Sequence, residues 1–170
     1  MAPRIIRDPN ELRAACDAVR MQGKRVGLVP TMGALHDGHL SLVTQVGVRA
    51  DLRVLTIFVN PLQFAPTDDL DRYPRTLEAD VERCATVGVD IVFAPAPDTM
   101  YPPGFQSHVE VEGITQPLEG EFRPGHFRGV TTVVNKLFNL VGPCAAAFGK
   151  KDFQQWRVLS RMVLDLSMPI

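Results

Sequence analysis

The chain has 170 residues, of which 45% are hydrophobic and 22% charged, and its formal net charge is −1. This length predicts one domain with a sizeable core, so we interpret residues 1–170 as a single domain. The balanced charge excludes bulk attraction to nucleic acid or to an anionic membrane. No segment reaches the roughly 18 apolar residues of a membrane span, and the first residues lack the apolar core of a signal peptide.

Three cysteines, Cys16, Cys84 and Cys144, lie far apart in apolar or helical stretches. An odd number of widely spaced cysteines indicates reduced thiols in a cytoplasmic protein, where their ordinary role is that of small buried side chains. No CxxC pair or Cys/His cluster indicates a zinc site. We therefore expect a cytoplasmic protein with no zinc.

Helices and strands alternate along most of the chain. Asp8 and Pro9 predict the start of the first helix, because Asp is a good N-cap and Pro suits the first helical position. The predicted helices are 8–21, 38–49, 76–87, 130–141 and 152–167. The predicted strands are 26–31, 53–60, 90–94 and 145–148, with a small accessory strand at 108–112 and loops at 61–74 and 119–129.

This alternation predicts an α/β fold, a Rossmann-like doubly wound parallel sheet with helices on both faces. In such sheets ligands bind outside the carboxyl ends of the strands, near the point where the strand order reverses. Polar and Gly-rich stretches follow three of the predicted strands, at 31–39, 60–63 and 149–152. We therefore expect the ligand site at this edge of the sheet.

The first candidate site is His36-Asp37-Gly38-His39, where a predicted strand leads into a predicted helix. A helix that begins near Gly38 presents free N–H groups and the positive end of its dipole, which bind anions. Two imidazoles beside that end can donate to phosphate oxygens, and Gly33 and Gly38 let a nucleotide come close to the backbone. The alternatives are histidines that only cap or pack, and a metal site, for which no third ligand is evident nearby.

The second candidate brings two amides, Asn60 and Gln63, to the end of an apolar strand. An amide both donates and accepts hydrogen bonds, which suits the hydroxyl and carboxylate groups of a small substrate. On the residues alone, turn chemistry around Asn60-Pro61 explains Asn60 better, and the role of Gln63 stays open.

The third candidate follows the last predicted strand, where Gly149, Lys150, Lys151 and Asp152 open a helix. A lysine at a helix N-terminus opposes the helix dipole, so its presence is explained by an anionic ligand whose charge it neutralises. The alternative is a solvated charge pair with Asp152 as the N-cap. Gln155 lies three residues further along the same helix face.

Two other segments carry less information. Arg123, His126 and Arg128 lie in a Gly/Pro-rich loop, and they are equally explained as a cationic clamp on phosphate or carboxylate and as a surface loop. The stretch from Met100 to Gly104 gives no indication of chemistry.

Together these segments resemble the pantothenate synthetase family. Residues 29–39 are similar to its nucleotide-binding signature, the family's form of the HxGH motif of the nucleotidylyltransferase superfamily. Residues 58–64 are similar to its FVNPxQF motif, and further matches are residues 73–76, 123–130 and 148–155. The resemblance extends over essentially the whole chain and implies the HxGH nucleotidylyltransferase type of the doubly wound fold.

The resemblance implies an ATP-dependent ligase that joins pantoate to β-alanine in two steps. The pantoate carboxylate attacks the α-phosphorus of ATP, which gives pantoyl adenylate and pyrophosphate, and the β-alanine amine then displaces AMP. It further implies ATP as a substrate, Mg²⁺ with its phosphates, and a homodimer. No protein nucleophile is needed, so the enzyme would act by positioning and charge stabilisation.

The family's site residues carry over to matching positions. His39 is the residue implied as proton donor, and His36, His39 and Lys151 would contact phosphates. Gln63 would bind pantoate and reach the β-alanine site, Gln155 would bind pantoate, and Asn60 is a further substrate-binding candidate. The ATP site would comprise Met32, Gly33, Ala34, Leu35, His36, Asp37, Gly38, His39, Gly149, Lys150, Lys151 and Asp152.

The chain departs from the family pattern at three places. Lys150 replaces a usual Glu, and Leu62 replaces a usual Met. The family continues after Ile170 with a strand, a Ser-Ser-Arg-Asn loop that closes on the ATP phosphates, and a C-terminal lid domain. We therefore expect residues 1–170 to be the truncated ATP- and pantoate-binding N-terminal domain, with impaired activity.

Two other functions compete with this interpretation. A related nucleotidylyltransferase shares HxGH but acts on a phosphorylated acceptor, for which cations would be expected in place of Gln63 and Gln155. A non-catalytic nucleotide-binding module is the third hypothesis, and a turnover assay separates it from the first.

Overall fold

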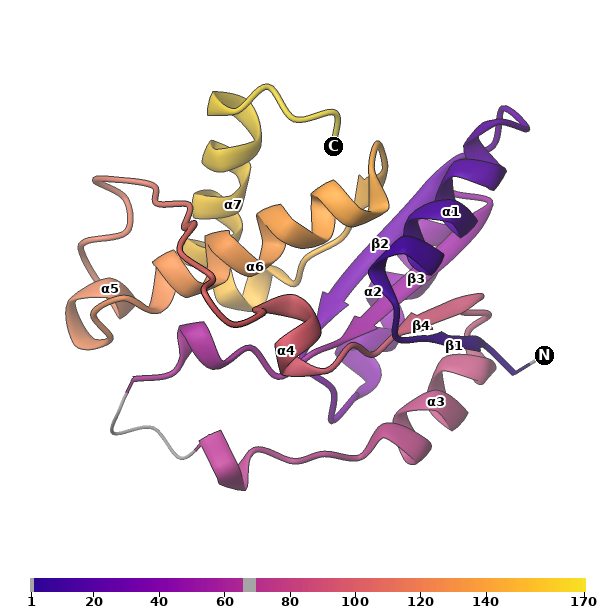
Figure 1. Ribbon diagram of the computed structural model, residues 1–170, viewed down its shortest axis with the longest axis horizontal. Coiled ribbons are helices and arrows are strands. Elements are labelled where there is room, and N and C mark those ends of the chain that lie inside the picture. The colour runs from indigo at the N-terminus through magenta and orange to yellow at the C-terminus, as the bar shows by residue number, and fades with distance from the viewer. Residues whose placement is uncertain (1, 66–69) are drawn as a thin grey trace.

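A five-stranded parallel sheet organises the protein (Figure 1). The computed structural model describes residues 2–65 and 70–170. The strand order is β1-β4-β3-β2-β5, and every pair of neighbours is parallel. The strands are β1 (Arg4–Ile6), β2 (Val26–Thr31), β3 (Leu52–Ile57), β4 (Ile91–Phe93) and β5 (Ala145–Ala146). The predicted doubly wound α/β fold is confirmed.

Helices cover both faces of this sheet. Helices α1 (Pro9–Arg20), α6 (His126–Val141) and α7 (Phe153–Asp165) share one apolar core, which includes Leu28 and Val54 of the strands. Helices α2 (Asp37–Gly47) and α3 (Leu77–Thr86) share a second core, which includes Val29 and Leu55. Successive strand residues therefore face opposite cores, as the alternation of side chains along a strand requires.

Short helical segments connect the larger elements. Two α-helical turns are α4 (Pro97–Met100) and α5 (Glu119–Phe122). Three 3₁₀ helices are η1 (Pro61–Gln63), η2 (Leu70–Arg72) and η3 (Lys150–Asp152). Of these, η1 and η3 follow β3 and β5, so they lie near the carboxyl edge of the sheet, where the sequence predicts a site.

Most predicted elements are present with small changes at their ends. Asp8 caps α1 as predicted, and its carboxylate accepts hydrogen bonds from the N–H groups of Asn10 at 2.8 Å and Glu11 at 2.9 Å. The sequence did not predict β1 or α5, and α6 begins at His126 and not at residue 130. Of the predicted loop 61–74, residues 66–69 lie outside the described residues.

The prediction of an accessory strand at 108–112 is wrong. These residues form no strand, because side chains of α6 bind their backbone. The N–H of Val109 donates to Thr132 Oγ1 at 3.1 Å, and its carbonyl accepts from Thr131 Oγ1 at 2.6 Å. The alternating pattern at 108–112 therefore reflects contacts with helix α6 and not pairing in a sheet.

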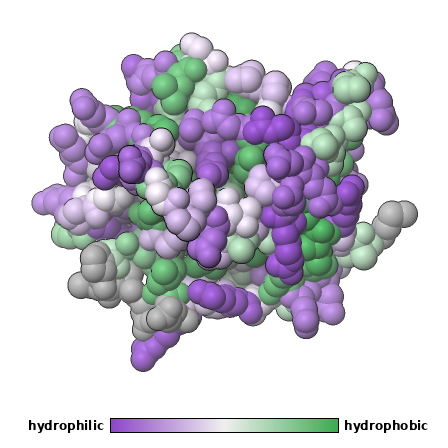
Figure 2. Space-filling model, in the orientation of Figure 1, coloured by the Kyte–Doolittle hydropathy of each residue, from purple (hydrophilic) through white to green (hydrophobic). Residues whose placement is uncertain are grey.

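The strand order reverses at β2. From β2 the chain proceeds to β3 and then to β4 on one side, whereas β5 lies on the other side of β2. A crevice forms at such a point outside the carboxyl ends of the strands. Figure 2 shows that polar side chains (purple) cover most of the visible face, with apolar side chains (green) in smaller patches. Within the described residues, no helix has the length and apolar character needed to cross a bilayer.

Candidate active site

A cavity of ≈ 460 Å³ lies at the carboxyl ends of β2, β3 and β5. The segments that the sequence singled out after these three strands all contribute to it, together with one face of α6. Its lining comprises Pro30, Thr31, Met32, Gly33, Ala34, His36, Gly38, His39, Leu42, Phe58, Asn60, Gln63, Tyr73, Val130, Val133, Val134, Leu137, Phe148, Gly149, Lys151, Asp152 and Gln155.

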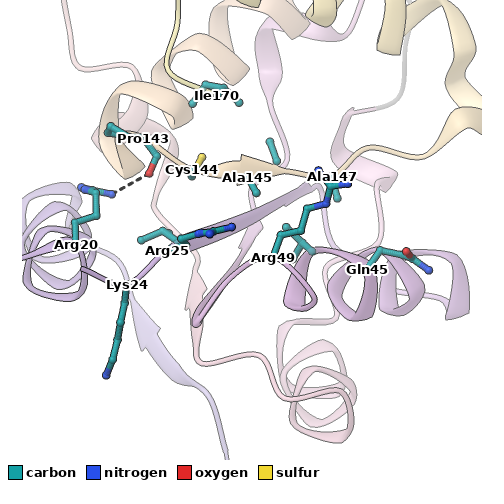
Figure 3. A pocket seen from close by; sticks show the side chains of 13 residues that line it. Arg20, Lys24, Arg25, Gln45, Arg49, Pro143, Cys144, Ala145, Ala147 and Ile170 are labelled. Atoms are coloured by element: carbon teal, nitrogen blue, oxygen red, sulfur yellow. Dashed lines mark hydrogen bonds between the residues drawn. The ribbon is translucent and has the colours of Figure 1, made fainter. Parts of the chain in front are cut away.

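A second, larger cavity of ≈ 730 Å³ lies at the opposite end of the strands (Figure 3). It is bordered by the start of β2 and by Pro143 before β5, and its cations are Arg20, Lys24, Arg25 and Arg49. Arg20 is engaged by the chain itself, because its Nη1 donates to the carbonyl of Pro143 at 3.3 Å. None of the site residues predicted from the sequence lines this cavity, so the smaller cavity is the candidate active site.

The loop after β2 is held by a buried carboxylate. Gly33 and Ala34 have φ of 90° and 49°, a left-handed conformation that favours glycine and strains alanine. Asp80 on α3 stabilises this turn, since its two oxygens accept from the N–H groups of Ala34 at 2.9 Å and Leu35 at 2.7 Å. Thr76 Oγ1 donates to the same carboxylate at 3.1 Å, and Asp80 is only 2% exposed.

The two histidines cap the N-terminus of α2, and they hold each other in place. His36 Nδ1 accepts from the N–H of Gly38 at 3.1 Å, and His39 Nδ1 accepts from the N–H of His36 at 3.4 Å. Their ring centroids are 4.1 Å apart. A Cβ on residue 38 would meet the His36 ring at 2.8 Å, so the glycine lets that ring fold back on the helix end. Because each Nδ1 accepts, the proton of each neutral ring lies on Nε2.

His39 is held in its neutral form. Burial first, then the neighbouring His36 and Lys151, lower the pKa of the His39 imidazole below its usual 6.5. At neutral pH the His39 ring therefore acts as an Nε2–H donor and not as a cation. A polyanion placed at this helix end would be met by the His39 donor and by the positive end of the α2 dipole.

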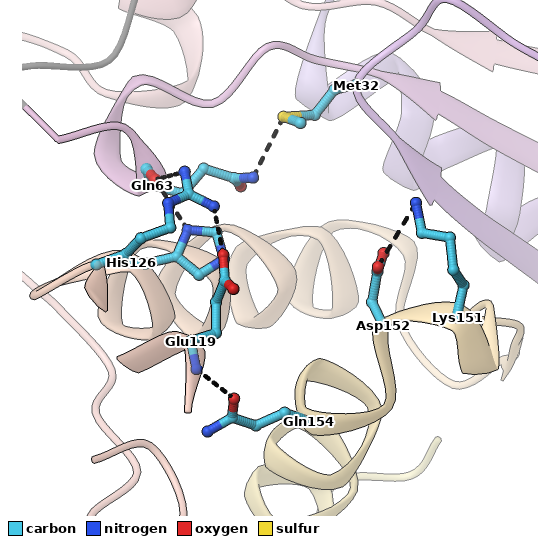
Figure 4. A network of polar contacts seen from close by, with 8 residues as sticks. Met32, Gln63, Glu119, His126, Lys151, Asp152 and Gln154 are labelled. Carbon is cyan, nitrogen blue, oxygen red and sulfur yellow. Dashed lines mark hydrogen bonds and ion pairs between the residues drawn. The ribbon is translucent and has the colours of Figure 1, made fainter. Parts of the chain in front are cut away.

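The amides of Asn60 and Gln63 form one network, and Figure 4 shows Gln63 with its further partners Met32 and His126. Asn60 is 1% exposed, and its Nδ2 donates to Gln63 Oε1 at 3.0 Å. Gln63 Nε2 donates to Met32 Sδ at 3.2 Å, so the network reaches from η1 to the loop after β2. The carbonyl of Gln63 accepts from His126 Nδ1 at 2.9 Å and from Arg123 Nη2 at 3.4 Å.

Close packing of α6 against η1 depends on Gly129. A Cβ at this position would clash with the carbonyl of Leu62 and would lie 2.6 Å from Cα of Gln63. The carbonyl of Gly129 accepts a hydrogen bond from Asn60 Nδ2 at 3.1 Å. The glycine therefore lets the helix backbone and the amide-bearing turn touch directly.

The segment after β5 contributes charge to the cavity. Lys151 Nζ lies 3.6 Å from Asp152 Oδ1, and both residues line the cavity with Gly149 and Gln155. Figure 4 shows Lys151 and Gln63 on opposite sides of the open space. Lys150 is directed elsewhere, since its Nζ lies 5.7 Å from the centroid of the Trp156 ring.

Apolar side chains form much of the remaining wall. Residues 130, 133, 134 and 137 lie three and four apart on α6, which places them on one helix face. Phe58 and Phe148 add aromatic surface from the ends of their strands. The cavity thus combines N–H donors and one lysine with a broad apolar wall, which suits a ligand with an anionic part and an apolar part.

The structure brings most predicted site residues together. Asn60, Gln63 and Gln155 all line the cavity, as do the predicted ATP-site residues except Leu35, Asp37 and Lys150. Leu35 is buried in the α2/α3 core, and the Asp37 side chain is 95% exposed beside Arg83. The sequence reasoning missed Asp80, which holds the loop, and Tyr73 on the cavity wall. The only sequence signal for Asp80 is its position four residues after Thr76.

The thiols are not suited to nucleophilic chemistry. All three cysteines are free. Burial raises the pKa of Cys16 and of Cys84 to about 11 and that of Cys144 to about 12. None of them lines the candidate active site. They are therefore protonated near neutral pH and serve in packing.

The parallel sheet and the His36–His39 turn at its switch point define an α/β protein of the HxGH type. A family model described as Pantoate-beta-alanine ligase matches residues 4–170. The chain therefore belongs to the pantoate–β-alanine ligase family, as the sequence resemblance predicts.

Relatives and solved structures agree with this family. The chain is 57% identical to the pantothenate synthetase of Syntrophotalea carbinolica and 55% identical to that of Geobacter sulfurreducens. Each alignment covers 98% of the chain and 59% of the relative. The chain thus spans about 59% of the length of these curated relatives.

A pantothenate synthetase structure from Thermus thermophilus superimposes with a TM-score of 0.91 at 50% identity, over 98% of this chain and 59% of that one. The pantoate–β-alanine ligase of Francisella tularensis superimposes with a TM-score of 0.93 at 36% identity, over 99% of this chain and 64% of that one. That structure is described as a complex with β,γ ATP and β-alanine.

Proposed function

We propose that this chain supplies the ATP- and pantoate-binding site of an ATP-dependent ligase that condenses pantoate with β-alanine. One observation carries the proposal. A single cavity joins the paired histidines and Lys151, which suit phosphate, to Gln63 and Gln155, which suit a small hydroxy acid. The Francisella relative, described as a complex with β,γ ATP and β-alanine, supports ATP and β-alanine as ligands.

The nucleotide is assigned to the N-terminal end of α2. His36 and His39 offer Nε2–H donors there, and the first N–H groups of the helix add positive potential. Lys151 supplies the formal positive charge on the cavity wall. We assign His39 the proton-donor role and Lys151 the phosphate contact. The low pKa of His39 makes its neutral ring a hydrogen-bond donor to phosphate in the resting protein.

Pantoate is assigned to the side of Gln63 and Gln155. Its carboxylate and hydroxyl groups need hydrogen-bonding partners, which amides provide without a fixed charge. Its quaternary carbon with two methyl groups suits the apolar face of α6 formed by Val130, Val133 and Val134. Asn60 is assigned an indirect role, because its buried amide is engaged by protein groups.

The proposed reaction needs no covalent bond to the protein. A carboxylate oxygen of pantoate forms a bond to the α-phosphorus of ATP, and the bond to the bridging oxygen breaks to release pyrophosphate. The neutral amine of β-alanine then bonds to the acyl carbon and loses a proton to water, while the bond between that carbon and the AMP oxygen breaks and AMP leaves with its electron pair. The raised pKa of each thiol agrees with catalysis by alignment and charge stabilisation alone.

Magnesium is proposed as a partner of the nucleotide. Among residues 2–65 and 70–170 no group of three His, Cys, Asp or Glu side chains is arranged to hold a metal ion. Mg²⁺ commonly uses substrate phosphates, water and one or two carboxylates, so this donor set fits an ion that arrives with ATP. Asp152 is the carboxylate on the cavity wall that would face it, and the ion would neutralise phosphate charge.

The place of this domain in the whole protein, its cellular location and its oligomeric state are also proposed. We assign residues 1–170 to the N-terminal, substrate-binding domain, as the family resemblance implies, and the relatives are longer, since the match covers 59% of their length. Free thiols support a cytoplasmic location. A homodimer is implied by the family, and the exposed apolar side chains of Leu118 and Phe122 offer surface for it. Sedimentation velocity of this chain tests the dimer.

The decisive experiment measures pyrophosphate release from ATP with Mg²⁺ and pantoate, without β-alanine. We expect release that requires pantoate and falls about 100-fold in His39→Ala. His108→Ala is the matched control, because His108 lies outside the cavity, beside Phe105.

Other outcomes separate the competing functions. Binding of both ligands without release would identify this chain as a binding domain whose chemistry needs the rest of the longer relatives. Release that requires a phosphorylated acceptor in place of pantoate would identify a nucleotidylyltransferase. Absence of both binding and release would contradict the proposal.

A further inference from the structure

Tyr101 makes a contact with the candidate site that no sequence motif predicts. It follows α4, and its hydroxyl donates to Asn60 Oδ1 at 2.7 Å. The ring is held by Phe105, with centroids 4.9 Å apart, and by Phe58, with centroids 5.9 Å apart. Lys136 Nζ lies 5.8 Å from its centroid. With the ring fixed on several sides, the hydroxyl has little freedom to leave Asn60.

The Asn60 amide is saturated by four hydrogen bonds. Its Oδ1 accepts from Tyr101 and from the N–H of Leu62 at 3.3 Å. Its Nδ2 donates to the carbonyl of Gly129 at 3.1 Å and to Gln63 Oε1 at 3.0 Å. A backbone N–H can only donate and a backbone carbonyl can only accept, so this amide has one possible orientation.

That orientation determines which atoms Gln63 presents. Because Asn60 donates to its Oε1, the oxygen of Gln63 is engaged by the protein. The Nε2 group has two hydrogens, and its protein partner is the weak acceptor Met32 Sδ at 3.2 Å. Gln63 is thereby set to donate to a ligand, which selects a carboxylate or hydroxyl oxygen as the group recognised there.

We infer that Tyr101 is a positioning residue that acts through Asn60 to set the Gln63 amide as a hydrogen-bond donor to the oxygen of a hydroxy-acid substrate. The inference rests on the proposed function for the identity of that substrate. The connection from Tyr101 through Asn60 to Gln63 rests on the two hydrogen bonds alone.

The binding test uses Tyr101→Phe, which removes the hydroxyl and keeps the ring. By calorimetry on this chain, we expect pantoate affinity to fall about three- to tenfold, the effect of losing one hydrogen bond, with ATP affinity unchanged. In a Gln63→Ala background the same substitution should have no further effect on pantoate affinity, because the group through which it acts is gone. Ser160→Ala, which removes a hydroxyl bound to the carbonyl of Trp156, is the control.

A second readout needs no ligand. In the wild-type chain the side-chain NH₂ signals of Asn60 should exchange slowly with solvent in ¹⁵N-resolved NMR, because both hydrogens have protein acceptors and the residue is 1% exposed. Tyr101→Phe should speed this exchange by about threefold or more, whereas Ser160→Ala should leave it unchanged. A role in stability alone would not produce a change confined to Asn60 and Gln63.

The outcomes distinguish a failure of the proposed function from a failure of the role inferred for Tyr101. If wild-type chain fails to bind pantoate, the proposed function fails for this chain, and the NMR comparison alone decides the inference. Unchanged side-chain signals of Asn60 and Gln63 in Tyr101→Phe would overturn the inference. Additive losses of pantoate affinity in the double variant would overturn it as well, because they would show that Tyr101 acts independently of Gln63.

Discussion

The carboxylate of Asp80 accepts a hydrogen bond at 2.7 Å from the backbone N–H of Leu35, across 45 residues of sequence. This contact joins α3 to the loop after β2, and the neighbouring oxygen binds the N–H of Ala34. It stabilises a turn with two successive residues at positive φ, from which Met32, His36 and His39 reach the cavity. The shape of the HxGH loop therefore depends on a residue outside the motif.

Asp80→Asn tests this dependence. The substitution replaces one acceptor oxygen by an NH₂ group that faces a backbone N–H in a buried position. We expect a loss of about 1–3 kcal/mol in the free energy of unfolding, together with weaker ATP binding. Urea denaturation and calorimetry measure the two effects. Asp165→Asn, in an exposed pair with Arg161, should change neither. Wild-type stability in Asp80→Asn would contradict the assigned role.

Gly129→Ala should destabilise the protein although it lies within a helix. Alanine in place of glycine normally stabilises a helix by about 1 kcal/mol. Here the added Cβ would clash with the carbonyl of Leu62, so we expect a net loss of about 1–3 kcal/mol and weaker pantoate binding. Gly149→Ala is the control for stability, since φ there is −72° and a Cβ would meet nothing within 4 Å. A stabilised Gly129→Ala variant would refute the close packing.

Lys151→Ala and Lys150→Ala should differ in their effect on ATP. Lys151 lines the cavity, so its removal should weaken ATP binding about tenfold or more, as expected for a hydrogen bond to a charged group. Lys150 lies near the ring of Trp156, and its removal should weaken binding by less than about threefold. Titration with a non-hydrolysable ATP analogue measures both affinities. Equal or reversed effects would show that the wrong lysine is assigned to phosphate.

The protonation of His39 should link pH to stability and to ATP binding. Burial, His36 and Lys151 lower the pKa of His39 in the folded chain, so below pH 6.5 the unfolded state binds more protons. Its contribution to stability is therefore complete above pH 6.5 and is lost as the pH falls through the folded pKa. Bound phosphate favours the imidazolium and raises this pKa, so ATP affinity should fall as the pH rises through the same window.

An NMR titration of the imidazole Cε1–H signals measures this pKa directly. Lys151→Ala should raise the pKa of His39, because a nearby cation is removed. In His39→Gln the part of the pH dependence of ATP affinity that belongs to His39 should disappear. A pKa at or above 6.5 in the ligand-free chain would contradict the burial of this ring.

Much of the site was predictable because its residues are local in sequence. His36 and His39 act on the same helix turn, and Asn60 and Gln63 on the same 3₁₀ turn, so spacing alone indicated that each pair acts together. The strand-then-polar pattern indicated the edge of the sheet at which the candidate cavity lies. Asp80 and Tyr101 could not be predicted in this way, because the site residues that they bind, Ala34 and Leu35 for Asp80 and Asn60 for Tyr101, are 41 or more residues away in sequence.

The same distinction explains the errors in secondary structure. Residues 108–112 alternate like a strand, but the hydroxyls of Thr131 and Thr132 bind Val109 and replace a neighbouring strand. β1 has only three residues and exists because it pairs with β4, some 87 positions further along the chain. A local sequence pattern shows how apolar side chains alternate. It does not show which strand or helix a segment pairs with, because that depends on the folded chain.

The sequence by itself determined the doubly wound architecture, the HxGH turn and the edge of the sheet where the candidate site lies, since periodicity and helix-end chemistry act between near neighbours. Only the tertiary structure decided that Lys150 lies against Trp156 and not in the cavity, how the Gln63 amide is oriented and what holds the strained turn after β2. Those properties depend on contacts of Trp156, Tyr101 and Asp80 that exist only after the sheet has brought distant segments together. Each is a buried or directional interaction, whose partner no local pattern specifies.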